Sequence, residues 1–243
     1  MKNILITIIL ILLSFSVSAQ EIFSTDDEFN DFFTYYYLNP QPQKIIPFIN
    51  YYVSSELYNK VNSRMIVAHF AAYTLRGEDY MLEELFKEQN DNGDVSAKIF
   101  TLHIFWVADT DRAKELLSKA ETSWKNSLVQ ETIQKFKEWG TYNVLLKTPT
   151  NPGDIDNLWG IFMATGNPKA IKQIMTVLPL KKSAEKEKNL NKLILSGSAE
   201  WSLTANAKQH EKVCDIIKDE AKNATGITKQ ILEEIIKKVE KNL

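Results

Sequence analysis

The fold is decided by the stretch "LWGIFMATGNPKAIKQIMTVL" (residues 158–178). Its apolar run stops at Gly166, and apolar residues return after Pro168 with the three- and four-residue spacing of a helix. Glycine ends helices because it adopts the left-handed conformation that other residues resist, whereas asparagine and proline begin them. The stretch therefore predicts two helices joined at a corner, with Gly166 and Asn167 as its structural residues.

Similar corners recur in the chain. Residues 70–86, "FAAYTLRGEDYMLEELF", align without gaps onto residues 159–175 and place Gly77 where the first corner has Gly166. A third copy lies at residues 202–214, with Ala205 at the corner, and a fourth, weaker copy lies at residues 106–117. The four corners are 32, 57 and 39 residues apart. Since a helix pair with one apolar face must stack on its neighbours, the pattern predicts an all-α fold, an irregular αα-superhelix of stacked helical hairpins.

The rest of the chain is also helical in pattern. Glycine and proline together make up 15 of the 243 residues, fewer than a sheet protein with many tight turns needs. The predicted helices are 26–38, 42–54, 56–75, 78–89, 94–108, 110–120, 123–139, 141–147, 154–165, 168–178, 184–204, 207–222 and 226–242. We expect one helical domain over residues 20–243, with a possible subdomain seam at the polar segment 148–154.

The N-terminus has the features of a secretory signal. One lysine precedes the apolar run Ile4–Ala19, which ends in the small residues Val17 and Ala19 of a cleavage site. This run of 16 residues is shorter than the roughly 20 that span a bilayer, although a retained N-terminal anchor is the alternative. We expect cleavage after residue 19, export to the periplasm or the extracellular space, and no membrane insertion of the mature chain, which has no second long apolar run.

Charge and cysteine content narrow the classes of partner. Residues 20–110 carry 14 acidic and 6 basic side chains, and the formal net charge of the whole chain is −2, which argues against a nucleic-acid partner. Cys214 is the sole cysteine, so the chain cannot form an intramolecular disulfide and burial of apolar surface must stabilise it.

At the corner residues the chain resembles the broad class of helix-turn-helix repeat proteins, the tetratricopeptide-like αα-solenoids. The segments "LWGIFMATGNPKAIKQI" (158–174) and "SAEWSLTANAKQHEKV" (198–213) also resemble a group of uncharacterised exported helical proteins, over residues 25–222. The regular 34-residue period of tetratricopeptide repeats is absent. The resemblance implies a helical-repeat fold and supplies no catalytic residues.

Few residues suggest chemistry. His69, His103 and His210 are each expected inside a helix without a second ligand at metal-binding spacing, so we predict core or groove histidines and no metal site. His210 and Cys214 are four residues apart, on one helical face, but no orienting group accompanies them, so Cys214 is expected to pack as a small apolar residue.

Motifs for cofactors are absent from the sequence. It has no glycine-rich dinucleotide or phosphate loop and no serine-hydrolase elbow, so we expect no cofactor. The acidic pairs Asp26-Asp27, Glu83-Glu84 and Asp154/Asp156 can do acid–base chemistry only within a cleft. Otherwise they are helix-start and surface residues.

Aromatic residues are the main candidates for binding. Residues 32–52 hold more tyrosines than one buried stripe requires, and tryptophans recur near the corners. The candidate aromatic surface is Tyr35, Tyr37, Tyr51, Trp106, Trp159 and Trp201. The alternative is that these rings pack in the core with their polar atoms at its rim.

These observations predict an exported, soluble helical scaffold that binds an unknown protein or peptide and has no catalytic activity. The alternative is a small helical envelope enzyme, or an enzyme inhibitor, that acts on a cell-wall or glycan substrate. Exposed tyrosine and tryptophan along a groove would favour the scaffold. A pocket that joins a histidine to two carboxylates would favour the enzyme.

Overall fold

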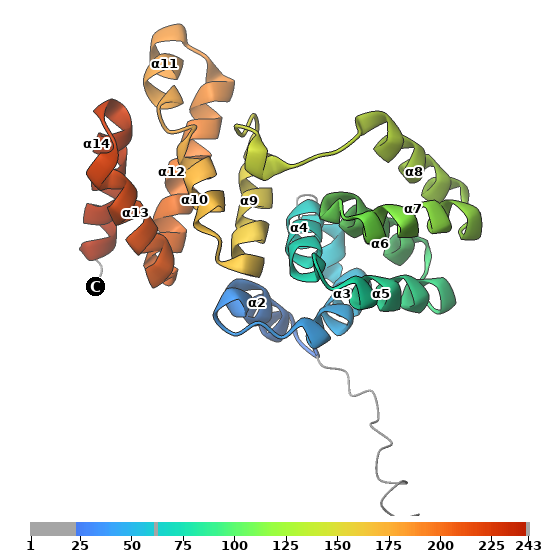
Figure 1. The fold of residues 1–243 in the computed structure, drawn as a ribbon. Helices are drawn as coiled ribbons and strands as arrows, with labels where there is room; N and C mark the ends of the chain where they lie inside the picture. The colour runs from blue at the N-terminus through green and yellow to red at the C-terminus, as the bar shows by residue number, and fades with distance from the viewer. Residues whose placement is uncertain (1–22, 61–62, 242–243) are drawn as a thin grey trace, which may run out of the picture.

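The computed structural model describes residues 23–60 and 63–241, and every regular element in these ranges is a helix, as predicted (Figure 1). The α-helices are α2 (Asp26–Tyr35), α3 (Ile45–Ser54), α4 (Ser63–Leu75), α5 (Asp79–Asp91), α6 (Val95–Ala108), α7 (Asp111–Ser123), α8 (Ser127–Trp139), α9 (Pro152–Thr165), α10 (Pro168–Met175), α11 (Leu180–Glu187), α12 (Leu190–Gln209), α13 (Glu211–Asn223) and α14 (Gly226–Glu240). Short 3-10 helices are η1 (Tyr36–Leu38), η2 (Pro42–Lys44), η3 (Glu56–Asn59) and η4 (Val144–Leu146). The predicted signal peptide, residues 1–19, lies outside the described residues.

The helices stack in a superhelical order around a central pair, α4 and α9. Helices α5 to α8 pack on one another at one end of the molecule, and α10 to α14 do so at the other (Figure 1). Helix α4 packs against α6 on one side and against α9 on the other. The chain crosses from the end formed by α5 to α8 to the centre just before the predicted seam, since η4 already contacts α9 and α10. The seam, residues 148–154, then runs into the first turn of α9.

Gly160 sets the spacing of the central pair. A Cβ atom added at Gly160 would lie 2.4 Å from the carbonyl oxygen of Ile66 in α4. Glycine is therefore required for the two helix backbones to approach this closely. The same contact explains why a glycine stands in the middle of an otherwise apolar helix.

The corner between α9 and α10 has the geometry that its residue types favour. Gly166 has φ 61° and ψ 19°, in the left-handed region, and its N–H donates to the carbonyl of Phe162. Asn167 caps α10 by accepting a hydrogen bond from the Lys169 N–H, and Pro168 occupies the first turn. Gly77, between α4 and α5, also has a positive φ, of 97°.

The third predicted corner is wrong. Helix α12 continues through Ala205 to Gln209, because alanine favours the helix interior and nothing there ends it. The corner lies at His210 instead, whose extended backbone separates α12 from α13, so His210 is not inside a helix.

Three other predicted helices differ from the structure. The segment 56–75 contains η3 and α4, with extended backbone at Lys60, because Tyr58 turns inward to pack its ring against Tyr52 and Phe100. The segment 184–204 belongs to two helices, since Lys188 takes the left-handed conformation and Asn189 caps α12. Of 141–147, only η4 is helical.

Most of the aromatic surplus of residues 32–52 packs in the core. The Phe29 and Phe48 rings stack with centroids 4.3 Å apart, and Tyr52, fully buried, stacks beside Phe29. Phe48 also contacts Phe70 of α4. These rings attach α2 and α3 to the central pair.

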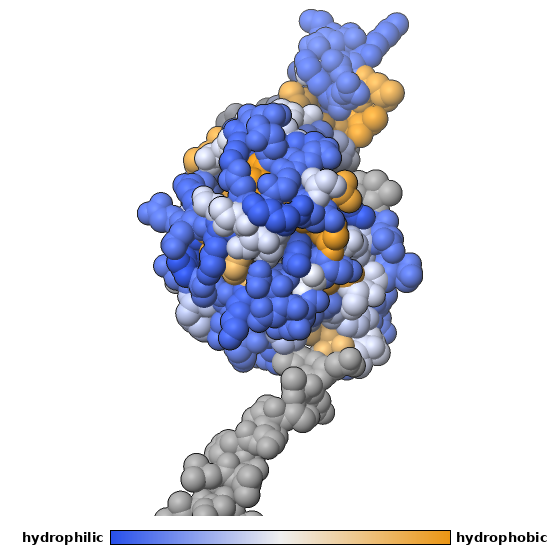
Figure 2. Space-filling model, turned by 90° about the vertical axis from the view of Figure 1, so that its right-hand side faces the viewer, coloured by the Kyte–Doolittle hydropathy of each residue, from blue (hydrophilic) through white to orange (hydrophobic). Residues whose placement is uncertain are grey.

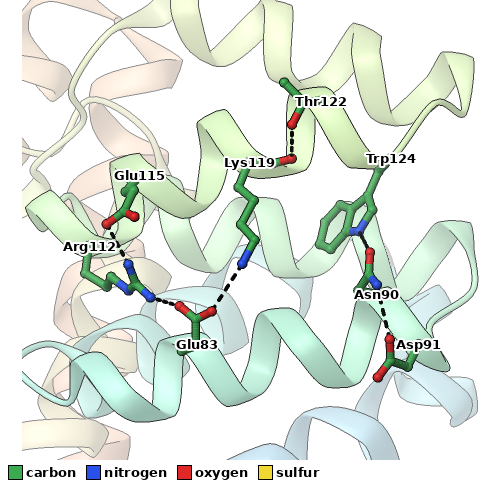
Figure 3. Close-up of polar contacts among 8 residues, drawn as sticks. All are labelled: Glu83, Asn90, Asp91, Arg112, Glu115, Lys119, Thr122 and Trp124. Atoms are coloured by element: carbon green, nitrogen blue, oxygen red, sulfur yellow. Dashed lines mark hydrogen bonds and ion pairs between the residues drawn. The ribbon is translucent and has the colours of Figure 1, made fainter.

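Helices α5 and α7 are joined by an apolar contact and by polar contacts, and Figure 3 shows the polar ones. The Trp124 ring stacks on Phe86 at 5.1 Å, and its indole N–H donates to the Asn90 side chain at 3.1 Å. Glu83 forms ion pairs with Arg112 and, at 3.2 Å, with Lys119. The buried tryptophan supplies the larger share of this contact, because the ion pairs are partly solvated.

Candidate functional site

The six residues of the predicted aromatic surface do not come together. Trp159 is a core residue with 4% of its surface exposed, so it is not available as a binding residue. Trp106 stacks between Phe136 and Tyr142, and its indole N–H donates to the Gly140 carbonyl at 2.8 Å.

The three tyrosines of that set have local partners. The Tyr51 hydroxyl donates to Asp26 at 2.8 Å, near the start of α2. Tyr35 accepts a hydrogen bond from Gln209, and the Tyr37 hydroxyl lies 3.1 Å from Nδ1 of His210. Two tyrosines thus fasten η1 and the end of α2 to the turn between α12 and α13. Trp201 alone is widely exposed, at 74%.

Trp201 belongs to an apolar face of α12 that is partly exposed in the described structure. Leu190, Leu193 and Ile194, at 65%, 41% and 47% exposure, share this face, because they precede Trp201 by eleven, eight and seven residues. We call these four residues the α12 apolar face. Figure 2 shows hydrophobic side chains on one flank of the protruding end that α11 and the start of α12 form.

The opposite face of α12 is buried. Leu195, Ala199 and Leu203 pack into the core on that side. The helix therefore carries two apolar faces, and only one has an intramolecular role. A helix that is apolar on two sides binds a second partner or is fully enclosed.

Basic residues border the α12 apolar face. Residues 181–192 carry five lysines and two glutamates, and Lys182, Lys186 and Lys188 are exposed. Glu200, on α12, accepts from Lys181 at 2.7 Å and from Lys238 at 3.0 Å. Partial burial acts to raise the pKa of Glu200, but these two ammonium groups outweigh it and hold the pKa below its usual value.

A second candidate site is a cavity of about 650 Å³ where α4, α6 and the start of α9 meet. Its polar lining includes Arg64, His103, Asp154 and Asp156. The structure thus brings one predicted candidate histidine together with one of the acidic pairs noted in the sequence. The two carboxylates differ sharply in their surroundings.

Asp154 is a structural residue. It accepts hydrogen bonds from the Tyr142 hydroxyl at 2.6 Å, from the N–H and hydroxyl of Thr150 at 2.8 and 2.9 Å, and from the Asn151 amide at 3.1 Å. Partial burial acts to raise the pKa of Asp154, but these donors prevail and hold the pKa below its usual value. The carboxylate therefore stays charged and secures the start of α9.

Asp156 and His103 have free polar atoms. Among the described residues Asp156 has no hydrogen-bond or ion-pair partner, and burial raises the pKa of its carboxyl. His103 Nδ1 lies 2.9 Å from the Ile99 carbonyl, to which it donates, and burial lowers the pKa of the imidazole. The neutral ring therefore keeps its Nε2 as a hydrogen-bond acceptor.

The other titratable candidates do not form a site. Within the described ranges no three histidine, cysteine or acidic side chains are grouped as metal ligands. His69 and His210 are buried, and the Nε2 of each has no partner there. Cys214, half-buried on α13, is next to the apolar core, while His210 contacts Tyr37.

Sequence reasoning missed Leu190, Leu193 and Ile194. The signal was present, because apolar residues of α12 fall into two sets with helical spacing, 190/193/194/201 and 195/199/203. It also missed Arg64 as a residue that lines the same cavity as His103 and Asp156. No local pattern joins residues that are 39 and 53 positions apart in sequence.

No protein-family model, curated protein or solved structure matches this chain. Among the residues that the structure describes, none of the helices combines the length and apolar character needed to cross a bilayer. The α12 apolar face and the cavity are the two features of the structure that bear on function.

Proposed function

We propose that this chain is an exported binding protein whose α12 apolar face docks an amphipathic helix of another protein. The observation that carries the proposal is the exposure of Leu190, Leu193, Ile194 and Trp201 on one side of a helix. Tryptophan is enriched in binding hot spots, and a contiguous exposed apolar patch marks an interaction surface.

The length and charge of the face define the partner. Leu190 and Trp201 are separated by about 16 Å along the helix axis, which matches about three turns of a partner helix. The lysines of residues 181–192 border one end of the face. A partner helix with acidic residues beside its apolar stripe fits this border, because opposite charges align and accelerate docking.

Export is the second part of the proposal. The predicted signal, residues 1–19, supports it, and N-terminal sequencing of the chain from an export-competent cell tests it. We expect the mature chain to begin at Gln20. A chain that retains Met1 and stays inside the cell would contradict export and would leave the α12 face to be tested separately.

The docking experiment uses a photoreactive residue. Trp201→benzoylphenylalanine is irradiated in envelope extract, and cross-linked peptides are sequenced. We expect one partner segment with acidic residues and apolar residues at helical spacing. The double variant Leu193→Ser/Ile194→Ser is expected to lose the complex.

The matched control is Trp139→Ser. Trp139 is 60% exposed but lies on α8, away from α12, so its loss is expected to leave the complex intact. Circular dichroism checks that both variants stay folded. Equal loss of binding in the control and the α12 variant would contradict the proposal.

The alternative function is a small envelope enzyme that acts on a cell-wall or glycan substrate. It has one observation in favour, since the cavity joins His103 to Asp154 and Asp156. Glycoside hydrolysis generally uses two carboxyl groups, however, and Asp154 is engaged by hydrogen bonds to Tyr142, Thr150 and Asn151. We therefore prefer binding. Release of soluble fragments from purified cell wall by the mature chain would reverse this preference.

A further inference from the structure

We propose that the cavity between α4, α6 and the start of α9 binds a small zwitterion, an α-amino acid or dipeptide, with its ammonium group at Asp156 and His103 and its carboxylate at Arg64. This inference is independent of the α12 apolar face. It concerns a different part of the molecule and a different class of ligand.

The cavity has the size of a small-molecule site. Its volume of about 650 Å³ lies within the roughly 300–1,000 Å³ that such sites occupy. Its lining combines apolar groups, among them Met65, Ile99 and Phe100, with the polar groups described above. Three separate segments of the chain supply this lining, so the cavity is a product of the tertiary fold.

Asp156 and His103 specify a donor-rich cationic group. Both offer acceptors, the carboxylate oxygens of Asp156 and Nε2 of the neutral His103 ring, and neither acceptor has a partner among the described residues. A half-buried carboxylate without a counter-charge is unfavourable. An ammonium group, with three N–H donors and a positive charge, satisfies both residues together.

Arg64 specifies the anionic group. Its guanidinium lies over the Tyr58 ring at 4.3 Å, and its Nε donates to the Tyr58 carbonyl at 3.0 Å. These contacts hold the group at the cavity while its terminal nitrogens make no ion pair with any described carboxylate. Paired N–H donors of this kind match a carboxylate.

The N-terminus of α9 also contributes to the cavity. Asn151, Pro152 and Gly153, at the start of this 14-residue helix, line the cavity. The charged Asp154 carboxylate already accepts hydrogen bonds at this end of the helix, so the ligand carboxylate is assigned to Arg64 and not to the helix N-terminus. Hydrogen bonds from Tyr142 and Thr150 occupy the oxygens of Asp154, so the acceptors that remain for the ammonium group are those of Asp156 and His103.

Isothermal titration calorimetry of the mature chain tests the assignment. The probes are L-alanine, L-lysine and L-alanyl-L-alanine, with propylamine and propionate as analogues that each lack one charge. We expect at least one zwitterion to bind with a Kd below about 1 mM, and each analogue to bind at least about tenfold more weakly. Asp156→Asn and Arg64→Gln are each expected to weaken binding about tenfold or more, whereas Glu233→Gln, on the exposed side of α14, is expected to have no effect.

A second measurement covers the case in which a variant does not fold. The chain has three histidines, so the imidazole proton resonances of His103 are assigned readily in the wild-type protein. Saturating zwitterion is expected to shift the His103 resonances and leave those of His210 unchanged. The proposal is overturned if no zwitterion binds, if propylamine binds as tightly as the amino acids, or if binding leaves His103 unperturbed.

Discussion

The carbonyl oxygen of Ile66 occupies the place where a side chain at Gly160 would begin. A Cβ atom at residue 160 would lie 2.4 Å from this oxygen and 3.2 Å from its carbonyl carbon. The central helices α4 and α9 therefore touch through backbone atoms. This contact sets the spacing of the central helix pair.

Gly160→Ala is expected to destabilise the protein by about 1–3 kcal/mol, because the added methyl group must push α9 away from α4. Gly197→Ala is the matched control. Gly197 is also inside a helix, but a Cβ there meets nothing within 4 Å, so alanine is expected to stabilise the protein by about 0.5–1 kcal/mol. Urea denaturation measures both changes. If Gly160→Ala does not lower the free energy of unfolding relative to Gly197→Ala, then α4 and α9 are not in backbone contact.

Gly166 and Lys188 both have left-handed backbone conformations, so substitutions at these two positions are expected to have opposite effects on stability. Gly166→Ala is expected to cost about 1–2 kcal/mol, because residue 166 has φ 61° and a Cβ there would meet Lys212 Nζ at 2.7 Å and Tyr37 at 3.0 Å. Lys188 has φ 52° at the end of α11, so Lys188→Gly relieves the same strain and is expected to stabilise the protein. Thermal denaturation followed by circular dichroism compares the two. A lower Tm for Lys188→Gly would refute the strain argument.

The buried imidazole of His69 is expected to make the stability of the folded protein sensitive to acid. Burial lowers the pKa of His69 from 6.5 to about 4, and its Nδ1 donates to the Met65 carbonyl at 2.8 Å. Because the unfolded chain binds this proton more readily, stability is full above about pH 6.5 and falls as the pH drops toward 4. The loss from this residue alone is expected to be about 2 kcal/mol at pH 5.

His69→Leu isolates that effect. The variant is expected to show a flatter dependence of the free energy of unfolding on pH between pH 7 and pH 5, since leucine fills the space without a titrating group. Denaturation with urea at several pH values measures the slope. An unchanged slope would show that the folded protein binds this proton as readily as the unfolded chain, and it would contradict the lowered pKa of His69.

Substitutions at the contact between α5 and α7 distinguish apolar from ionic contributions to the stability of the protein. Trp124→Ala is expected to cost about 3–5 kcal/mol, because the buried ring stacks on Phe86. Glu83→Gln is expected to cost less than about 1 kcal/mol, because its ion pairs with Arg112 and Lys119 are partly exposed. Urea denaturation at low and at high salt measures the free energy of unfolding of both variants. A larger loss for Glu83→Gln than for Trp124→Ala would contradict this ranking.

The sequence allowed the helical class and several corners to be predicted from local chemistry. Gly166, Asn167 and Pro168 act within one turn of the chain, so their conformations follow from residue type. The same reasoning failed at Ala205. The corner was predicted there from similarity to another corner, although alanine does not end a helix. The reasoning also failed over residues 56–75, where packing of the Tyr58 ring prevails over helical periodicity.

The candidate functional residues also divide into those that the sequence identified and those that only the tertiary structure brought together. The sequence alone identified His103 and the pair Asp154/Asp156 as titratable groups and Trp201 as an aromatic candidate. Only the tertiary structure placed His103, Asp156 and Arg64 around one cavity, buried Trp159 and left α12 with a partly exposed apolar face. Helix ends depend on atoms within a few residues, whereas burial and convergence depend on which distant helices pack together, as at Gly160 and Ile66.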